Sequence, residues 1–157
     1  MPRAVVNHWE SLPIELEYDT FGDKKNPALV LIRGFGAQMV AWHEDFVNML
    51  AARGHFVVRF DNRDVGLSTK LDGVNVDSNA VVTAALLEQP IPPVPYTLSD
   101  MAADAVGLLD HLGIDKAHIM GASMGGMIAQ VFAIEHPTRT ASLVSVMSMS
   151  GEPETME

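Results

Sequence analysis

Cysteine is absent from this chain of 157 residues, and basic side chains are few. A chain without cysteine forms no disulfide, no thiolate zinc site and no cysteine nucleophile, and the reducing cytoplasm is its expected compartment. Ten Lys and Arg residues against 20 Asp and Glu residues leave a net charge of -10. Because this charge repels phosphate backbones and anionic lipid, we expect neither nucleic acid nor a membrane as a partner. Small or neutral molecules fit the charge better.

Long apolar runs are scarce as well. No apolar stretch precedes Glu10, so the sequence predicts no secretory signal. The uncharged segment 117–134 is almost as long as a transmembrane helix, which needs ~20 apolar residues. It contains the polar residues His118, Ser123 and Gln130, however, which argue against a membrane span. A strand, a tight turn and a buried helix explain this segment better. With 48% hydrophobic and 19% charged residues, the composition predicts one globular domain over residues 1–157.

The first half of the chain has the pattern of a parallel sheet. Two continuous apolar runs, 28–32 and 55–60, are typical of buried parallel strands. Between them, residues 43–53 carry apolar side chains at helical spacing, and Gly54 stands where a glycine commonly ends a helix. This order predicts a β-α-β unit. Upstream, 14–18 alternates apolar and acidic residues and is followed by turn residues, which favours a hairpin into the next strand.

A second unit follows an irregular, proline-rich loop at 69–96, where clustered prolines exclude regular helix and central strand. Thr97 is the predicted N-cap of a helix that ends at Gly113. A strand at 117–120, a sharp turn and another helix come next, and 141–149 is predicted as the last strand. The chain is therefore predicted to be an α/β protein with helices on both faces of a mostly parallel sheet.

Ser123 is the candidate nucleophile, because Gly121-x-Ser123-x-Gly125 falls between a predicted strand and a predicted helix. A serine at the tip of so sharp a turn needs neighbours without a Cβ atom two residues away on either side. The turn exposes Oγ, and the amide of Met124 at the positive end of the helix can point at a developing oxyanion. The alternative is a glycine-rich helix start without chemistry.

A second glycine-rich stretch, Arg33-Gly-Phe-Gly36, follows the strand at 28–32. A phosphate-binding loop is the alternative interpretation, but no Lys-Ser or Lys-Thr follows, and the third glycine of a dinucleotide fingerprint is missing. The sequence Asp61-Asn-Arg63-Asp64 could be mistaken for a metal or acid-base cluster. We expect a structural role instead, with the carboxylates and Arg63 paired to one another and to turn amides.

Taken together, the motifs resemble the N-terminal part of the α/β-hydrolase superfamily, and within it the serine esterases related to polyketide-tailoring methylesterases. The match spans nearly the whole chain. Two positions depart from the pattern, since most relatives carry His-Gly at 33–34 and many carry Arg-Gly at 63–64. The residues that carry the resemblance are Ile32-Arg-Gly-Phe-Gly36, Phe60-Asp-Asn-Arg-Asp-Val-Gly-Leu-Ser68, Tyr96-Thr-Leu-Ser-Asp-Met-Ala-Ala-Asp-Ala-Val106 and Gly121-Ala-Ser-Met-Gly-Gly126.

The resemblance implies hydrolysis of small to medium carboxylic esters through a covalent intermediate on Ser123. Gly121 and Gly125 are then the glycines of a nucleophile elbow, the amides of Phe35 and Met124 form the oxyanion hole, and neither a cofactor nor a metal is implied. Epoxide hydrolase and haloalkane dehalogenase chemistry is disfavoured, because those relatives place Asp at the elbow. Lactonase, thioesterase and perhydrolase activities stay open. From another class, a binding module that keeps the fold without a catalytic base is the alternative.

The acid and the histidine of a catalytic triad are expected to lie outside this chain. In this superfamily they follow the serine in the order acid, then histidine. His136 follows Ser123, but 13 helical residues at ~1.5 Å each place it roughly 20 Å away. Among the earlier histidines only His43 is expected near the site, where a helix-start or substrate-contact role suits it better. Glu152 and Glu154 are weak candidates for the acid.

The chain is accordingly expected to be an incomplete domain, without the C-terminal cap and the segments that bear the acid and the histidine. The strand at 141–149 is then an open edge, which can pair with another chain. We expect either self-association through this edge or a complementing C-terminal fragment.

Overall fold

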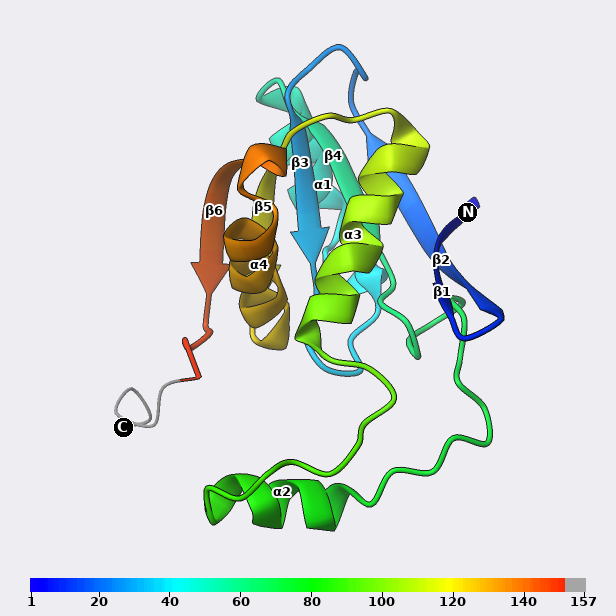
Figure 1. Ribbon diagram of the computed structural model, residues 1–157. Helices are drawn as coiled ribbons and strands as arrows, with labels where there is room; N and C mark the ends of the chain where they lie inside the picture. The colour runs from blue at the N-terminus through cyan, green and yellow to red at the C-terminus, as the bar shows by residue number, and fades with distance from the viewer. Residues whose placement is uncertain (152–157) are drawn as a thin grey trace.

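A computed structural model describes residues 1–151 and shows one six-stranded sheet (Figure 1). The strands are ordered β1-β2-β4-β3-β5-β6. Every pairing among β4, β3, β5 and β6 is parallel, whereas β2 is antiparallel to both β1 and β4. The strands are β1 (Arg3–Trp9), β2 (Leu12–Phe21), β3 (Ala28–Ile32), β4 (Phe56–Phe60), β5 (Ala117–Ala122) and β6 (Thr140–Val146).

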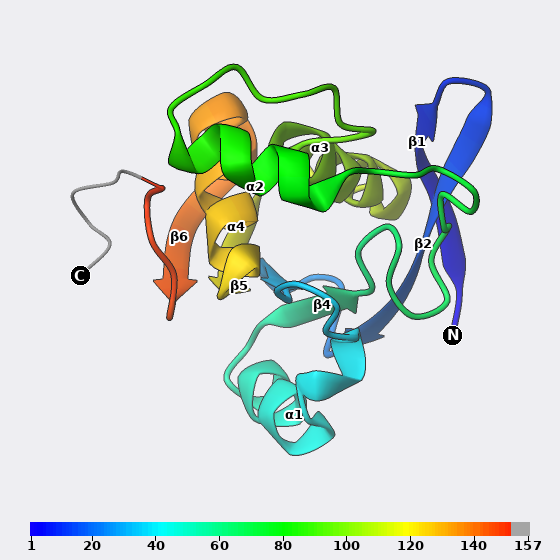
Figure 2. The ribbon, with the colours of Figure 1, turned by 90° about the horizontal axis from the view of Figure 1, so that it is seen from below.

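Helices cover both faces of the sheet, which confirms the predicted fold class. α3 (Leu98–Leu112) and α4 (Met124–Glu135) lie against one face, and α1 (Glu44–Ala52) lies against the other (Figure 2). Two short 3-10 helices, η1 (Met39–Ala41) and η2 (Pro137–Arg139), complete the connections. No helix of the described residues is long and apolar enough to cross a membrane.

The central strands β3 and β4 are buried at every position, as their apolar residues predict. Arg59 of β4 is also buried, and it pairs with Asp19 at 3.0 Å. The core therefore divides into two clusters, one under α3 and α4 and one under α1. The predicted ends of α3 are confirmed, since Thr97 and Asp100 form a reciprocal capping box. Gly113 ends the helix in the left-handed conformation, with φ of 69°, a conformation that glycine adopts at little cost.

The hairpin predicted between β2 and β3 is wrong, because β4 lies between these two strands and β2 pairs antiparallel with it. The turn residues that follow β2 are present, but the β-α-β crossover from β3 to β4 brings β4 against β2. The first strand, β1, was not predicted. Its sequence lacks regular alternation, and a register irregularity between Val5 and Asn7 breaks its ladder with β2.

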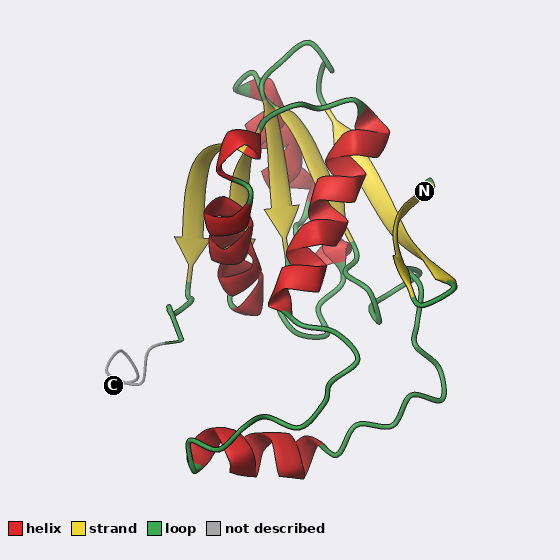
Figure 3. Ribbon diagram, in the orientation of Figure 1, coloured by secondary structure: helices red, strands yellow, loops and turns green. Residues whose placement is uncertain are grey.

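Segment 69–96 is less irregular than predicted, because it contains the helix α2 (Ser78–Leu86) (Figure 3). The side chain of Asp77 caps this helix by accepting a hydrogen bond from the backbone N–H of Ala80 at 3.0 Å. The prolines all follow α2, so they do not interrupt it. α2 lies apart from the sheet, and its apolar side chains Val82 and Leu86 are exposed (Figure 1).

The last strand, β6, pairs with β5 and forms an edge of the sheet within residues 1–151. Five of its seven residues are exposed, which agrees with the predicted open edge. The strand ends at Val146, earlier than predicted, because Met147 adopts a left-handed conformation with φ of 48°.

Candidate active site

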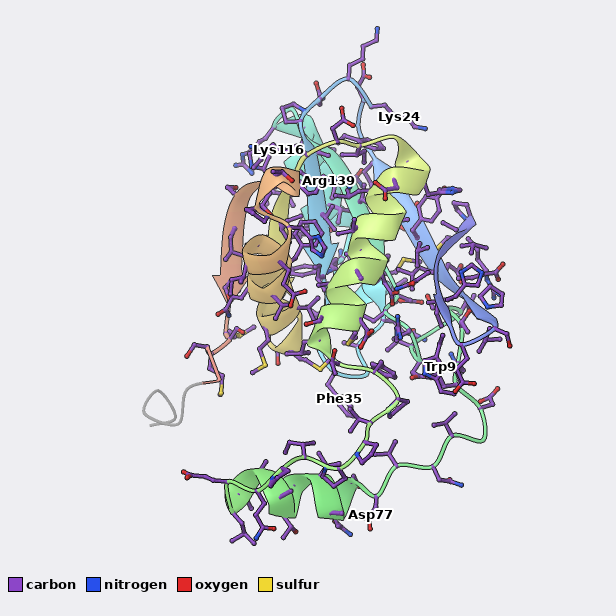
Figure 4. The ribbon with its side chains drawn as sticks, in the orientation of Figure 1. Trp9, Lys24, Phe35, Asp77, Lys116 and Arg139 are labelled. Carbon is purple, nitrogen blue, oxygen red and sulfur yellow. The ribbon has the colours of Figure 1, made fainter. Side chains whose placement is uncertain are left out.

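The candidate residues meet where the parallel strands β3 and β5 end at their carboxyl edge, the usual place for a ligand in an α/β sheet. Figure 4 shows Phe35 at this edge, with Lys24, Lys116 and Arg139 at the opposite end of the sheet. Because β3 and β5 are neighbours in register, with Ile32 paired to Gly121, the loops that follow them lie side by side.

Ser123 is held in a conformation that side chains rarely adopt. It lies between β5 and α4 with φ of 58° and ψ of -129°, and its side chain is exposed. Its N–H donates to the carbonyl of Val146 at 2.9 Å, and its own carbonyl accepts from Gly126 N–H at 2.8 Å. These two backbone bonds fix the turn, so that the strained conformation is set by the surrounding structure rather than by the serine side chain.

The glycines of the motif are present because no space exists for a Cβ atom. A Cβ on Gly121 would collide with the carbonyl of Gly125, and a Cβ on Gly125 would collide with the carbonyl of Ile32. A Cβ on Gly126 would come within 2.7 Å of Ser148 Oγ. The close approach that the sequence pattern predicts at 121 and 125 is therefore observed, and Gly126 adds a third contact, between α4 and the segment after β6.

The loop after β3 passes directly over this turn. An ideal Cβ on Gly34 would lie 3.0 Å from Ser123 Cβ and 3.2 Å from the backbone nitrogen of Met124, so a side chain here would press on the turn. Among the described residues, neither Phe35 N–H nor Met124 N–H donates a hydrogen bond. One unpaired backbone donor thus lies in the loop after β3 and another at the first residue of α4, next to Ser123, and unpaired donors of this kind can bind an anionic oxygen.

Two cavities share Phe35 in their lining, and this residue is 88% exposed. A cleft of about 250 Å³ contains Ser123 and is bordered by Arg33 and Met147. A larger cavity of about 460 Å³ has mostly apolar walls and contains Met124 but not Ser123. Phe35 therefore lines both a cleft that holds the Ser123 hydroxyl and a cavity large enough for a sizeable apolar group.

A buried ion pair supports the floor of the larger cavity. The Arg63 guanidinium donates from Nε and Nη2 to the two carboxylate oxygens of Asp104, each at 2.7 Å, and both side chains are 2% exposed. Arg63 also lies over the Tyr96 ring, 5.0 Å from its centre. Burial lowers the pKa of Arg63, but the hydrogen bonds and the charge attraction to Asp104 outweigh burial and raise the pKa above its usual value. Burial also raises the pKa of Asp104, against the hydrogen bonds from Arg63.

The pairing predicted within residues 61–64 is thus wrong for Arg63, whose partner comes from α3. It is correct for the carboxylates, which accept hydrogen bonds from turn amides. Asp61 accepts from Met39 N–H at 2.6 Å, and Asp64 accepts from Leu71 N–H at 2.7 Å. These bonds tie the chain after β4 to two neighbouring loops.

Sequence reasoning missed Asp104 and Tyr96. A signal existed for Asp104, because it lies three residues after Met101 and four before Leu108, on the buried face of α3. A carboxylate on an apolar helix face requires a buried partner. For Tyr96 there was no such signal. Burial, followed by its hydrogen bond with Asp64, raises the pKa of Tyr96 to about 12, so its phenol stays protonated.

No histidine contacts Ser123 within residues 1–151. His43 caps α1 through its side chain, which confirms the expected helix-start role. His111 lies 3.4 Å from the Tyr18 hydroxyl, and His118 lies 2.8 Å from Ser142 Oγ. His136 packs on Phe132 at the far end of α4. Glu152 and Glu154 lie outside the described residues, and the described ones contain no group of three metal-ligating side chains.

The comparisons with known proteins agree with this architecture. The family model for the alpha/beta hydrolase fold matches residues 27–157. The chain belongs to the α/β-hydrolase fold family. Rhodomycin D methylesterase DnrP of Streptomyces peucetius is 32% identical over 147 residues, which cover 94% of this chain and 42% of the methylesterase.

Solved structures of α/β-hydrolases show the same arrangement of elements. An enol-lactonase from Burkholderia xenovorans LB400 is 28% identical with a TM-score of 0.66, and the match covers 88% of this chain and 44% of the lactonase. A hydrolase from Pseudomonas aeruginosa PA01 is 29% identical with a TM-score of 0.64, over 85% of this chain and 42% of that one. The chain thus spans about two fifths of the length of the relatives that it matches.

Proposed function

We propose that this chain carries the nucleophile and the oxyanion hole of a serine ester hydrolase. The observation that supports this most is the left-handed conformation of Ser123, with φ of 58°, at the first turn of α4. Such strain persists where function requires it. In this proposal Gly121 and Gly125 are the glycines of a nucleophile elbow, whose close packing supplies the constraint.

The reaction is acyl transfer in two steps. Ser123 Oγ attacks the ester carbonyl while a general base takes its proton, and the negative charge develops on the carbonyl oxygen. The amides of Phe35 and Met124 donate to that oxygen, and the N-terminus of α4 adds about half a positive charge. The C–O bond to the alcohol breaks, the alcohol leaves with the proton, and water then releases the carboxylic acid from Ser123.

The base and the acid that orients it are proposed to come from a complementing C-terminal segment. Two observations support this. Ser123 has no histidine partner within residues 1–151, and the relatives are more than twice as long as the matched part. The exposed edge of β6 is where such a segment could add to the sheet. Alternatively, two copies of this chain could associate through β6 and cover the exposed edge in that way.

The proposed substrates are small to medium carboxylic esters. This follows from the chemistry of the relatives, a methylesterase and an enol-lactonase, which both cleave acyl–oxygen bonds. The cleft of about 250 Å³ suits the ester group itself, and the adjoining cavity of about 460 Å³ suits its larger substituent. The absence of cysteine fits a cytoplasmic location, which we include in the proposal.

The test is turnover of p-nitrophenyl butyrate by the assembly that contains this chain, with Ser123→Ala as the variant. Turnover is expected to disappear while the circular dichroism spectrum stays unchanged, because backbone bonds and glycines set the turn. Ser99→Ala is the matched control, since Ser99 Oγ bonds to Glu135 on the exposed side of the helices. Full turnover in Ser123→Ala would refute the proposal, and an assembly that binds esters without cleaving them would favour a binding module.

A further inference from the structure

The loop after β3, residues 33–39, is held at both of its ends by two consecutive side chains. At its start, Asn62 Nδ2 donates to the carbonyl of Arg33 at 2.9 Å. At its end, Asp61 Oδ1 accepts from Met39 N–H at 2.6 Å. Both side chains follow β4 directly and are buried, since Asn62 is 2% exposed and Asp61 is 4% exposed. The chain after β4 therefore fixes the loop after β3.

Asn62 supplies a hydrogen bond at the point where the sheet stops. The parallel ladder between β3 and β4 ends at Leu31 and Arg59, so the Arg33 carbonyl lies beyond it. This carbonyl also faces the first turn of α4, because an ideal Cβ on Gly125 would lie 2.7 Å from its oxygen. The amide of Asn62 must turn its NH₂ group toward the carbonyl, since its own oxygen would meet a second acceptor. The Arg33 peptide thus lies between Asn62 and α4.

Between its two ends the loop forms a turn that leaves the Phe35 N–H free. Ala37 N–H donates to the carbonyl of Gly34 at 3.2 Å, and Gly36 has φ of 64°. Among the described residues, no acceptor pairs with Phe35 N–H. Gly34 lies against the turn after β5, where an ideal Cβ would be 3.2 Å from the backbone nitrogen of Met124. A shift at the start of the loop would move the Phe35 N–H, because only one residue lies between them.

We infer that Asn62 is a positioning residue for the oxyanion hole. By holding the Arg33 carbonyl, it keeps the Phe35 N–H directed at the oxygen on which charge develops. Asn62 lines neither cavity beside Phe35, so it acts through the loop and not on the substrate. A displaced donor stabilises the transition state less, whereas binding of the uncharged ester changes little. The catalytic effect rests on the proposed ester hydrolysis, but the fixing of the loop does not.

Steady-state kinetics of Asn62→Leu in the ester-hydrolysing assembly test this role, because leucine has nearly the same shape and no donor. The substrate is p-nitrophenyl butyrate, and active sites are counted by titration with a fluorophosphonate. The kcat per active site is expected to fall about tenfold to hundredfold, and KM to stay within about twofold. Affinity for an alkyl trifluoromethyl ketone, whose serine adduct carries an oxyanion, is expected to fall by the same factor as kcat/KM.

Asn62→Asp gives a second measurement that a purely structural role would not affect. At about pH 8 the introduced carboxylate has no proton to donate, so kcat is expected to fall at least as far as in Asn62→Leu. A protonated carboxyl can donate to the Arg33 carbonyl, and burial raises the pKa of such a group. The ratio of variant to wild-type kcat is therefore expected to rise about threefold or more between about pH 8 and pH 6. The same ratio for Asn62→Leu should stay constant.

Thr69→Val is the matched control from the same segment. Thr69 Oγ1 accepts from Glu15 N–H at 2.8 Å and so joins this segment to β2, away from the loop 33–39. The substitution is expected to leave kcat per active site unchanged.

Hydrogen exchange of the purified chain, followed by mass spectrometry, measures the loop without any activity. The peptide that contains residues 33–39 is expected to exchange about tenfold faster in Asn62→Leu than in the wild type. In Thr69→Val its exchange is expected to stay unchanged.

The outcomes separate this inference from the hydrolase proposal. Turnover that depends on Ser123 but stays within about twofold in Asn62→Leu would overturn only the inference. A loss confined to KM, a constant pH ratio in Asn62→Asp, or faster loop exchange with unchanged kcat would overturn it as well. Turnover that survives Ser123→Ala would overturn the hydrolase proposal, and the exchange measurement would still decide whether Asn62 holds the loop.

Discussion

The junction of β5 with α4 and the segment 69–96 lie at the same edge of the sheet, yet they are built in opposite ways (Figure 1). At the junction, an added Cβ at Gly121 or Gly125 would collide with backbone, and a serine is held in a left-handed conformation. In 69–96, Gly73 has no atom within 4 Å of an ideal Cβ, and α2 exposes the apolar side chains of Val82 and Leu86. At the junction the lack of room for side chains determines which residue types are allowed. In segment 69–96 the available room hardly restricts them.

The difference teaches which part of the site is rigid. The turn that holds Ser123 has a geometry fixed from several sides, as the proposed covalent chemistry requires. The segment that follows Asp64 contributes walls of the apolar cavities, where a variety of ligands can be accommodated. In this account the reaction belongs to the junction and the choice of substrate belongs to the looser segment.

Gly125→Val is expected to have the largest effect. The added side chain would collide with the carbonyls of Ile32 and Arg33 on β3 and the loop after it, and backbone cannot move aside without opening the sheet. We expect a loss of about 4 kcal/mol or more, enough to prevent folding. Thermal unfolding followed by circular dichroism measures it. Gly73→Ala is the matched control from the looser segment and should cost only about 1–2 kcal/mol, through its positive φ.

Asp104→Ala is expected to have the next largest effect, because it leaves the Arg63 guanidinium buried without a partner. Breaking a buried pair in this way costs about 3–5 kcal/mol. Chemical denaturation gives the value. The double variant Arg63→Met with Asp104→Leu should recover much of the loss, since it removes both charges and keeps apolar volume. A double variant as unstable as Asp104→Ala would contradict this explanation.

Thr97→Ala removes the cap of α3 and is expected to cost about 1 kcal/mol. The capping box with Asp100 satisfies two backbone donors at the start of this helix. The substitution leaves one of them, Asp100 N–H, to water, whereas the bond from the backbone N–H of residue 97 to the Asp100 carboxylate remains. The midpoint of denaturation should fall without a change in the slope of the transition. Thr83→Ala, on the exposed side of α2, should leave the midpoint where it is.

Leu86→Ser in α2 is expected to have the smallest effect, within about 0.5 kcal/mol of zero. The side chain is 79% exposed, so the substitution removes little buried apolar surface and breaks few packing contacts. Thermal unfolding of the chain checks this. A loss above 1 kcal/mol would mean that α2 packs against the body of the molecule in solution, and the contrast between the two regions would fail.

The same contrast explains how much the sequence could predict. The turn at 121–125, the cap at Thr97 and the buried strands were predictable, because each requires particular residue types at fixed spacing. The helix α2 was not, since only Ala84 of its short apolar sequence is buried and the exposed positions are apolar as well, which leaves no amphipathic pattern. The partner of Arg63 was missed for another reason. A long-range pair such as Arg63 and Asp104 depends on how helix and sheet dock, which local patterns do not encode.

The central claim is that Ser123 forms the covalent intermediate. A fluorophosphonate probe applied to the ester-hydrolysing assembly, followed by digestion and mass spectrometry of the peptide that contains residue 123, tests this most directly. The account predicts one probe group on Ser123, in parallel with loss of turnover, and no label on Ser123→Ala. A label on a different serine, or complete loss of turnover with Ser123 unmodified, would contradict it.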